Sequence, residues 1–508
     1  MKNRFDFTGL HVLDLANNHQ GSVDHALRII REHGEVMKKY GVKAALKFQF
    51  RNFDTFIHPA HKEGSDNKHI PRFLANALSD DDFATLTQAV DDAGMITMST
   101  PFDEESVDLI EKLDITVIKI ASCSAGDWPL LEKVATFNRP VIVSTGGLTL
   151  AEIDDVVSFL EHRSVDFALM HCVSIYPTPH ENLQLNQITT LKNRHPKRTI
   201  GFSTHEDPND TRAVMVAIAK GAQMLERHIG IETDTIKLNA YSSTPAQVDA
   251  WLAAGKLAHT MCGATERPDS LPEEQAALES LKRGVFATSD LAAGDNLQKS
   301  NVYFAMPVTP GQLTSDVWRA EASLTAPISK DGAIMLGQVQ LPAPPAHSPL
   351  IHAVHEVKSM LNECRIALPV DFNLEFSHHY GVERFNEIGA VLIDCINREY
   401  CKKLVIQLPG QAHPNHYHKR KEETFQVLAG EMELVLEGRH RVLYPGDLQV
   451  IPQGAWHSFS TSKGLIFEEV STTHHNDDSF YEDKEINQRG REYRKTLVKQ
   501  WGRFQLDS

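Results

Sequence analysis

The first 260 residues alternate between short apolar runs and longer amphipathic stretches, and this pattern constrains the fold more than any other feature. Eight runs have the length and composition of β-strands: HVLDLA, KAALKFQF, GMITMST, ITVIKIAS, RPVIVSTGG, VDFALMHC, RTIGFST and GAQMLERH. In the stretches between them, such as SVDHALRIIREHGEVMKKYG, apolar residues recur at three- and four-residue steps, which is typical of helices. Such alternation predicts a parallel sheet, and eight repeats favour a closed (β/α)8 TIM barrel over an open doubly wound sheet. We therefore predict an α/β barrel over residues 1–270.

The remainder of the chain has a different pattern of apolar and turn-forming residues. Residues 283–341 are rich in β-forming residues and turns, which predicts a small β-rich domain. A proline-rich linker is expected at 342–350, where closely spaced prolines oppose helix and sheet pairing. Residues 351–508 contain alternating strands, such as TFQVLAGEMELVLEG, separated by Gly and Pro-Gly turns. That pattern predicts an antiparallel β-barrel or jelly roll.

Composition excludes several classes of partner. The chain has 508 residues and a formal charge of −16, which disfavours nucleic acid and anionic membrane surfaces. Its six cysteines include no CxxC pair, so no disulfide framework is expected and a reducing compartment fits. No apolar run reaches about 18 residues, and the N-terminus has no signal-peptide core. We expect a cytoplasmic protein without membrane contacts.

The polar residues that end each predicted barrel strand are the candidate site, because chemistry in this fold sits at the carboxyl ends of the strands. They are Asp14, Asn18 and His19; Lys47 and Gln49; Ser99 and Thr100; Lys119 and Ser122; Ser144 and Thr145; His171, Ser174 and Tyr176; Ser203 and His205; and Glu226 and His228. Lysines with hydroxyls suit a phosphate or a carboxylate, and histidines from neighbouring strands suit a divalent metal. Taken singly, each lysine could be an ion-pair partner and each histidine a structural residue. Their convergence on one face favours binding.

A second candidate site lies in the last domain. His416 and His418 are two residues apart, so on a strand they face the same side. Glu423 follows after a short turn, and PGDLQVIPQGAWH brings His457 from a later strand. Three imidazoles and one carboxylate suit Mn, Fe, Ni or Zn, whereas a solvated histidine-rich loop is the alternative. The basic run 419–421 between them is either a solvated turn or faces a sugar or anion.

Two family resemblances follow from these motifs. STPFDEESVDLIEKL, IKIASCSAGDWPLLEKVA, RPVIVSTGGLTLAEID, MHCVSIYPTP and ERHI resemble the sialic acid (N-acetylneuraminate) synthase family, whose members condense phosphoenolpyruvate with an N-acylated sugar aldehyde. The resemblance covers roughly residues 10–341, including the small domain, which is similar to that family's antifreeze-protein-like (SAF) domain. The spacing of Gly410, the His-x-His pair, Glu423 and Gly430, followed by the PxG and His457, resembles the cupin family. The resemblance thus implies a synthase barrel, a SAF domain and a C-terminal cupin β-barrel.

The synthase resemblance implies roles for individual residues. It places phosphoenolpyruvate on Lys47, Thr100, Lys119, Ser122, Ser144 and Ser203, the sugar on Gln49 and Tyr176, and a divalent metal, Mn or Mg, on His205 and His228. Glu226 lies beside that metal, and Asp14 replaces the family's Glu; with Lys47 and Lys119 they form the expected catalytic group. The cupin resemblance implies a second metal on His416, His418, Glu423 and His457. The synthase family is homodimeric through its small domain, although that domain's arginine is replaced here by Met306.

Departures from the synthase pattern concentrate on the acceptor side. Cys123 and Ser124 replace a Gly-Glu pair, Ser174 replaces an Asn, and Asn239 falls near the family's late Asp. We therefore expect the donor to be kept and the acceptor sugar to be altered, giving a 3-deoxy-2-ulosonic acid and phosphate. The cupin either isomerises or epimerises the acceptor, or only binds a sugar or assists oligomerisation. The alternative for the whole chain is a non-catalytic carbohydrate-binding or regulatory protein on a degenerate barrel.

Overall fold

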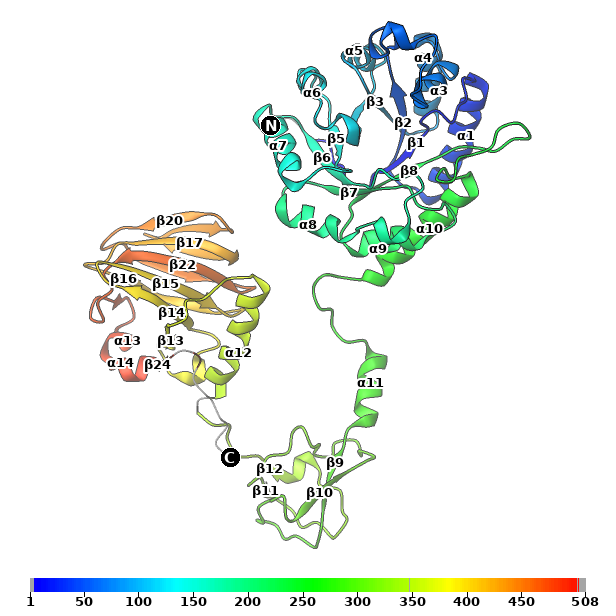
Figure 1. Ribbon diagram of the computed structural model, residues 1–508. Helices are drawn as coiled ribbons and strands as arrows, with labels where there is room; N and C mark the ends of the chain where they lie inside the picture. Colours follow the sequence, from blue (N-terminus) through cyan, green and yellow to red (C-terminus); the bar gives the residue numbers. More distant parts are fainter. Residues whose placement is uncertain (1–3, 347, 500, 502–508) are drawn as a thin grey trace. The chain divides into compact units, whose positions relative to one another are not determined.

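The computed structural model describes residues 4–346, 348–499 and 501 (Figure 1). The chain divides into two units, residues 1–269 and 270–508. Within the described ranges, no helix is both long and apolar enough to cross a lipid bilayer.

The first unit is a closed barrel of eight parallel strands, as the alternation predicts. The strands are β1 (His11–Asp14), β2 (Ala44–Phe50), β3 (Ile96–Pro101), β4 (Val117–Ile120), β5 (Val141–Ser144), β6 (Phe167–His171), β7 (Ile200–Thr204) and β8 (Met224–His228). Each strand pairs with its neighbour in sequence, and β1 pairs with β8, with His11 opposite Leu225 and Asp14 opposite His228. The closed barrel is confirmed, and the open sheet is wrong.

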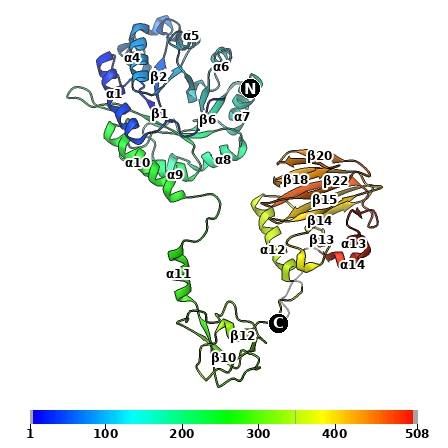
Figure 2. The same cartoon turned by 180° about the vertical axis from the view of Figure 1, so that it is seen from behind.

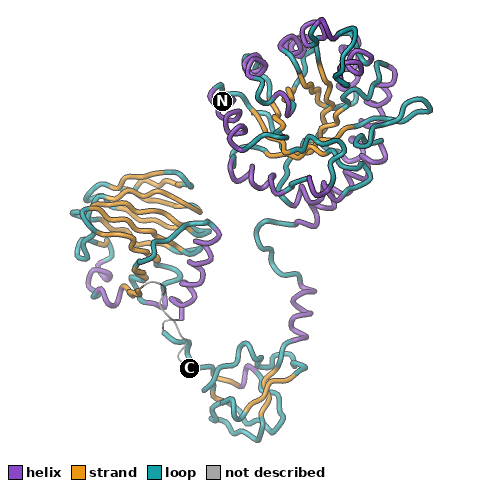
Figure 3. Tube along the Cα trace, viewed as in Figure 1, coloured by secondary structure: helices purple, strands orange, loops and turns teal. Residues whose placement is uncertain are grey.

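Helices surround the strands (Figure 3). They are α1 (Val23–Tyr40), α4 (Asp80–Asp92), α5 (Glu104–Lys112), α6 (Trp128–Ala135), α7 (Leu150–His162), α8 (Asn186–Arg194), α9 (Arg212–Ala219) and α10 (Pro245–Cys262). Several begin at a side-chain cap: Ser79 and Thr149, for example, form capping boxes that satisfy the first free N–H groups of α4 and α7. The long connection after β2 also carries the short helices α2 (Phe53–Phe56) and α3 (His69–Ala75).

The barrel interior changes from apolar to polar along each strand. Ala45 and Val117 belong to a buried apolar cluster at the amino-terminal end of the barrel. Lys47 and Lys119 follow two residues later on the same strands and are also buried. Because alternate residues of a strand face the same side, these lysines lie directly above the apolar layer. This layering places the polar side chains at the carboxyl ends of the strands.

The second unit begins with α11 (Pro272–Leu281) and the expected small β-rich module. Its strands are β9 (Gly284–Ala287), β10 (Val302–Ala305), β11 (Ser323–Leu324) and β12 (Val339–Gln340). Buried Val285, Leu297, Leu313 and Ile334 form its core. Helix α12 (Ser348–Glu363) then starts within the stretch 342–350, so residues 348–350 are helical rather than linker. Pro349 is tolerated there because the first turn of a helix needs no N–H from it.

The C-terminal part contains two antiparallel sheets, as predicted for residues 351–508 (Figure 2). Their strands are β13 (Asn373–Ser377), β14 (Ala390–Asn397), β15 (Tyr400–Gln407), β16 (Ala412–Tyr417), β17 (Glu423–Gly430), β18 (Met432–Leu436), β19 (Arg439–Leu443), β20 (Leu448–Ile451), β21 (His457–Ser460), β22 (Leu465–Thr472), β23 (Phe480–Tyr481) and β24 (Lys495–Lys499). The seven-stranded sheet has the order β20-β17-β22-β15-β14-β13-β24, and the five-stranded sheet has the order β19-β18-β21-β16-β23. Phe425, Phe459 and Phe467 pack between the sheets, while α12 packs through Leu350 on the outer apolar cluster. The helices α13 (Lys484–Gln488) and α14 (Arg491–Arg494) precede the last strand.

Candidate functional site

The centre of the barrel site is a buried group of two ammonium and two carboxylate side chains. The Lys47 Nζ lies 2.9 Å from Asp14 Oδ2 and 2.7 Å from Glu226 Oε1. The Lys119 Nζ lies 2.9 Å from Glu226 Oε2. Ser203 Oγ donates a further hydrogen bond to Glu226 Oε1 at 3.1 Å. The structure therefore brings the four residues expected to be catalytic into one network, with one residue each from β1, β2, β4 and β8.

The four charges determine one another's protonation. Burial opposes the charged form of Glu226, but Lys119 and Lys47 outweigh burial and hold the pKa of this carboxyl well below its usual range. Burial also opposes the charge on Lys47, and the carboxylates of Asp14 and Glu226 outweigh it and raise the pKa of Lys47. For Lys119, burial prevails over Glu226, and the pKa is lowered. The lysine that has a single carboxylate partner is thus the less firmly charged of the two.

Two histidines stand beside this network. The ring centroids of His205 and His228 are 5.3 Å apart. His205 Nδ1 lies 3.0 Å from the Val173 carbonyl oxygen, which can only accept, so Nδ1 carries the proton and Nε2 is left as a free lone pair. His228 Nε2 lies 3.4 Å from Asp14 Oδ2, and its buried Nδ1 has no hydrogen-bond partner.

Burial, which is the largest cause, lowers the pKa of His228 and lowers that of His205 to about 3. Both imidazoles are therefore neutral at pH 7, which is the form that binds a metal. Neutral nitrogens beside the Asp14 carboxylate fit a divalent cation.

The other barrel residues to which the family resemblance gives a substrate-binding role share one cavity of about 1150 Å³ with these groups. They are Gln49, Thr100, Ser122, Ser144 and Tyr176, whereas His19, Ser99 and Thr145 do not line the cavity. The Tyr176 ring lies 4.3 Å from the His205 ring and 5.1 Å from the Tyr241 ring, measured between centroids. All ten barrel residues assigned to the donor, the acceptor or the metal therefore line a single space with Asp14 and Glu226, and it is large enough for two small substrates.

Some strand-end residues have structural partners instead. Asn18 donates from Nδ2 to the Ile229 carbonyl at 2.7 Å, and His171 Nε2 lies 2.9 Å from the Leu183 carbonyl. Neither side chain lines the cavity. Their burial and polarity resemble those of the site residues, so the sequence alone does not separate them.

The structure adds residues that the sequence analysis missed. The connection after β2 lines the outer part of the cavity with Arg51, Lys68, Arg72 and Phe73, and Tyr241 lines it from the segment after β8. Arg51 follows Gln49 by two residues, so the alternation along β2 was the signal that could have identified it. The other residues belong to a connection without strand or helix periodicity in the sequence.

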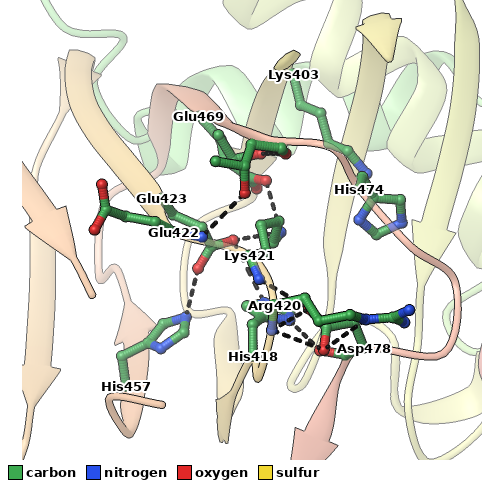
Figure 4. A network of polar contacts seen from close by, with 12 residues as sticks. Lys403, His418, Arg420, Lys421, Glu422, Glu423, His457, Glu469, His474 and Asp478 are labelled. Atoms are coloured by element: carbon green, nitrogen blue, oxygen red, sulfur yellow. Dashed lines mark hydrogen bonds and ion pairs between the residues drawn. The ribbon is translucent and has the colours of Figure 1, made fainter. Parts of the chain in front are cut away.

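The second site lies between the two C-terminal sheets. The ligand nitrogens of His416, His418 and His457 lie within 4.8 Å of one another. His416 and His457 are opposite each other in the pairing of β16 with β21, which explains why spacing in the sequence predicted this group. Glu423 approaches two of the histidines, with Oε1 3.4 Å from His418 Nε2 and Oε2 3.2 Å from His457 Nε2 (Figure 4).

The donor atoms of this second site are arranged for a cation. Each of the three histidines places Nδ1 against a backbone carbonyl, of Pro414, Asp478 and Ala455 respectively, which leaves Nε2 as a lone pair. His457 Nε2 and Glu423 Oε2 are buried without hydrogen-bond partners. Buried unsatisfied acceptors are costly, and a bound cation would satisfy them. Three nitrogens and one carboxylate oxygen fit a divalent transition metal.

The basic run 419–421 was expected to be either a solvated turn or a group that faces a sugar or anion, and its three residues differ in this respect. Lys419 and Arg420 are exposed, and Arg420 pairs with Asp477. Lys421 is buried, with Nζ 2.5 Å from Glu423 Oε1 and 2.9 Å from Glu469 Oε1 (Figure 4). The cavity at this centre is about 40 Å³, which holds an ion with a few waters and is far smaller than a typical sugar-sized pocket of roughly 300 Å³ or more.

Comparison with known proteins adds independent findings. The NeuB family model matches residues 35–266, and the cupin domain model matches residues 403–465. The chain is 31% identical over 292 residues to the uncharacterized protein MJ1065 of Methanocaldococcus jannaschii, covering 57% of this chain and 82% of that protein. It is 26% identical over 338 residues to the N-acetylneuraminate-9-phosphate synthase of Mus musculus, covering 65% of this chain and 92% of that protein. The crystal structure of a candidate spore coat polysaccharide biosynthesis protein E from Chromobacterium violaceum is 43% identical, with a TM-score of 0.62, and covers 66% of this chain and 100% of that one.

Proposed function

The chain belongs to the NeuB family of phosphoenolpyruvate-dependent transferases, and we propose that its barrel condenses phosphoenolpyruvate with a sugar aldehyde. The products are a 3-deoxy-2-ulosonic acid and phosphate. One observation carries the proposal: Lys47 and Lys119 share Glu226 at the bottom of a cavity that also holds His205 and His228.

The lysines and hydroxyls fit the donor. Phosphoenolpyruvate has a phosphate and a carboxylate, and ammonium groups with convergent hydroxyl donors bind both. Lys119 uses one carboxylate partner in the free protein, so part of its donor capacity is available. Thr100, Ser122 and Ser144 line the same space and supply neutral donors.

The histidine pair fits a divalent metal. His205 and His228 would hold it through neutral nitrogens, and two imidazole ligands favour Mn over Mg, which prefers oxygen. When bound, such a metal polarises the carbonyl of the aldehyde and stabilises the negative charge that develops on its oxygen.

The chain's own side chains orient the reaction. The lysines fix phosphoenolpyruvate so that its terminal enol carbon, C3, faces the aldehyde carbon, and the new carbon–carbon bond forms between them. Water then adds to C2, and the phosphate leaves from the same carbon. Glu226 is the carboxylate placed to accept the proton of this water, because phosphoenolpyruvate would compete with it for the two ammonium groups that hold its pKa low.

The C-terminal part is proposed to hold a second divalent ion, Mn, Fe, Ni or Zn, on His416, His418, Glu423 and His457. The small size of its cavity supports an ion-holding role over turnover of a hexose within it. We further propose that residues 283–341 are a SAF domain and that the protein is a cytoplasmic homodimer.

Phosphate release tests the barrel proposal. The metal-loaded full chain is incubated with phosphoenolpyruvate and with each member of a panel of aldoses and N-acyl aldoses. We expect phosphate release that depends on one class of aldose, together with an acid whose mass is that of acceptor plus pyruvate. A protein that only binds carbohydrate would release no phosphate. The His416→Ala, His418→Ala double variant, given each starting sugar, then tests the cupin: an unchanged product and rate would exclude a catalytic role for it.

A further inference from the structure

The outer part of the barrel cavity carries positive charge that the donor chemistry does not use. Arg51, Lys68 and Arg72, which we call the outer basic group, line it. The acidic side chains that line the cavity are Asp14 and Glu226, and both are held by Lys47. Among the described residues, none forms a salt bridge with a member of the outer basic group. In a chain with a formal charge of −16, such a local excess of unpaired cations is unexpected.

Arg51 is rigidly placed and keeps hydrogen-bonding capacity. Its guanidinium carbon lies 3.7 Å from the Phe102 ring centroid and 4.1 Å from the Phe73 ring centroid. Its Nη2 donates to Gln49 Oε1 at 3.2 Å, and its buried Nε has no partner. Stacked guanidinium groups with free edges are suited to bind a phosphate or a carboxylate.

The neighbouring carboxylate does not neutralise Arg51. Asp103 accepts from the backbone N–H of Asn52 and from Ser106, where it caps helix α5. Burial lowers the pKa of Arg51 to about 10, so the side chain remains a cation at neutral pH. Arg72 lines the same part of the cavity as Arg51, and two guanidinium groups that border one space repel each other unless an anion lies between them.

The position of Arg51 indicates which part of a substrate it meets. Lys47, Gln49 and Arg51 follow one another at steps of two residues toward the mouth of the barrel. Four residues at the rise of a strand span about 13 Å, so Arg51, directly after the end of β2, is expected at about that distance from Lys47. A sugar with its aldehyde beside the histidine pair would pass Gln49 and present its far end to Arg51.

We propose that the acceptor carries an anionic group, a phosphate monoester or a carboxylate, at the end remote from its aldehyde, and that the outer basic group binds it. This inference rests on the proposed function of the barrel. It deepens that function by naming the chemical class of the acceptor. A purely structural Arg51, tying the connection after β2 to Phe102, is the competing interpretation.

The test compares matched acceptors with the metal-loaded full chain. Mannose, glucose and N-acetylmannosamine are each supplied as the neutral sugar and as the 6-phosphate, with mannuronate and glucuronate as carboxylate probes. We expect kcat/KM for an anionic acceptor to be at least tenfold higher than for the matching neutral sugar. Comparison of the 6-phosphates with the uronates then shows whether the anion is a phosphate or a carboxylate. Equal or better use of a neutral sugar would overturn the inference and leave the synthase function intact.

Variants separate recognition from structure. The two variants are Arg51→Gln and Arg72→Gln, and Arg72 is exposed, so its substitution should not disturb the fold. In each variant, KM for the anionic acceptor should rise about tenfold to a hundredfold, because a hydrogen-bonded charge pair is lost. KM for phosphoenolpyruvate should change less than threefold. Lys62→Gln is the matched control, because Lys62 lies in the same connection, pairs with Asp54 and does not line the cavity. Unchanged KM values in both arginine variants would contradict the proposal.

If no acceptor is turned over, the proposed synthase function is wrong, and a binding measurement then tests the anion site separately. N-acetylmannosamine 6-phosphate is titrated calorimetrically into the phosphoenolpyruvate-free protein. Binding that weakens in Arg72→Gln and is absent for neutral N-acetylmannosamine supports the anion site. Absence of binding to the parent protein overturns it.

Discussion

Replacing Glu226 by glutamine tests the buried charge network directly. The carboxylate pairs with Lys47 and Lys119, whose side chains are 5% and 2% exposed. In Glu226→Gln, Lys47 keeps Asp14 as a partner, whereas Lys119 loses the one carboxylate that pairs with it among the described residues. Breaking a buried ion pair on one side costs about 3–5 kcal/mol, so we expect the free energy of unfolding of the barrel to fall by that amount at pH 7.

The pH dependence gives the same prediction a second readout. Burial already lowers the pKa of Lys119, and the loss of Glu226 lowers it further. The unfolded chain keeps the ordinary lysine pKa of about 10.4, so between the lowered pKa and that value the unfolded state binds more protons than the folded state. Stability of the variant therefore rises with pH in this window, and its deficit relative to the parent should shrink from pH 7 to about pH 9.5.

The assay is urea unfolding of the full chain, with hydrogen exchange on peptides from β2 and β4 to report on the barrel alone. The control is Glu111→Gln on the exposed surface of α5, which we expect to change stability by less than about 0.5 kcal/mol. Adding Lys119→Met to Glu226→Gln should restore part of the loss, because both partners of one pair are then neutral. A loss of stability below about 1 kcal/mol at pH 7, or one that does not shrink with rising pH, would show that Lys119 does not depend on Glu226 for its charge.

Three further predictions concern the metal sites. His205→Ala should weaken Mn²⁺ binding to the barrel at least tenfold by calorimetry. In the parent, that affinity should fall less than about threefold from pH 7.5 to 5.5, because burial lowers the pKa of His205 to about 3; a tenfold fall would count against a neutral imidazole pair. The His416→Ala, His418→Ala double variant should carry one metal ion per chain fewer than the parent by elemental analysis, and an equal content would exclude the second centre. Lys421→Met should bind metal more tightly by several-fold, because a cation 2.5 Å from Glu423 is removed, and should lower the stability of the metal-free domain; Lys419→Met, which is exposed, should do neither.

The barrel and its inner site could be predicted because they follow from the periodicity of apolar residues and from the positions of polar residues along the predicted strands. Eight strand-like runs require eight strand ends, and those ends must meet at one rim of a parallel barrel. Lys47, Lys119 and Glu226 lie on three of these strands, in their middle or carboxyl-terminal halves, so their contact across the barrel follows from topology. The histidine group of the second site was predictable for a similar reason, since His416 and His457 are paired in register.

The outer part of the cavity could not be predicted in this way. It is lined from a connection whose short helices α2 and α3 have no strong periodicity in the sequence. The environment of Arg51 depends on Phe73 and Phe102, which come from different connections and meet only in the folded chain. Lys421 was ambiguous for the same reason, because its burial depends on Glu469 from a distant strand.

Isotope-labelled phosphoenolpyruvate distinguishes the proposed condensation from simple hydrolysis of this substrate. The metal-loaded chain is given phosphoenolpyruvate labelled at all its carbons together with the panel of sugars, and the products are analysed by mass spectrometry. We expect one new acid that carries every labelled carbon, is formed in equal amount with phosphate, and is lost in Lys47→Met and Lys119→Met. Phosphate released without a sugar, labelled carbon recovered only as pyruvate, or full activity in both lysine variants would contradict the proposed condensation.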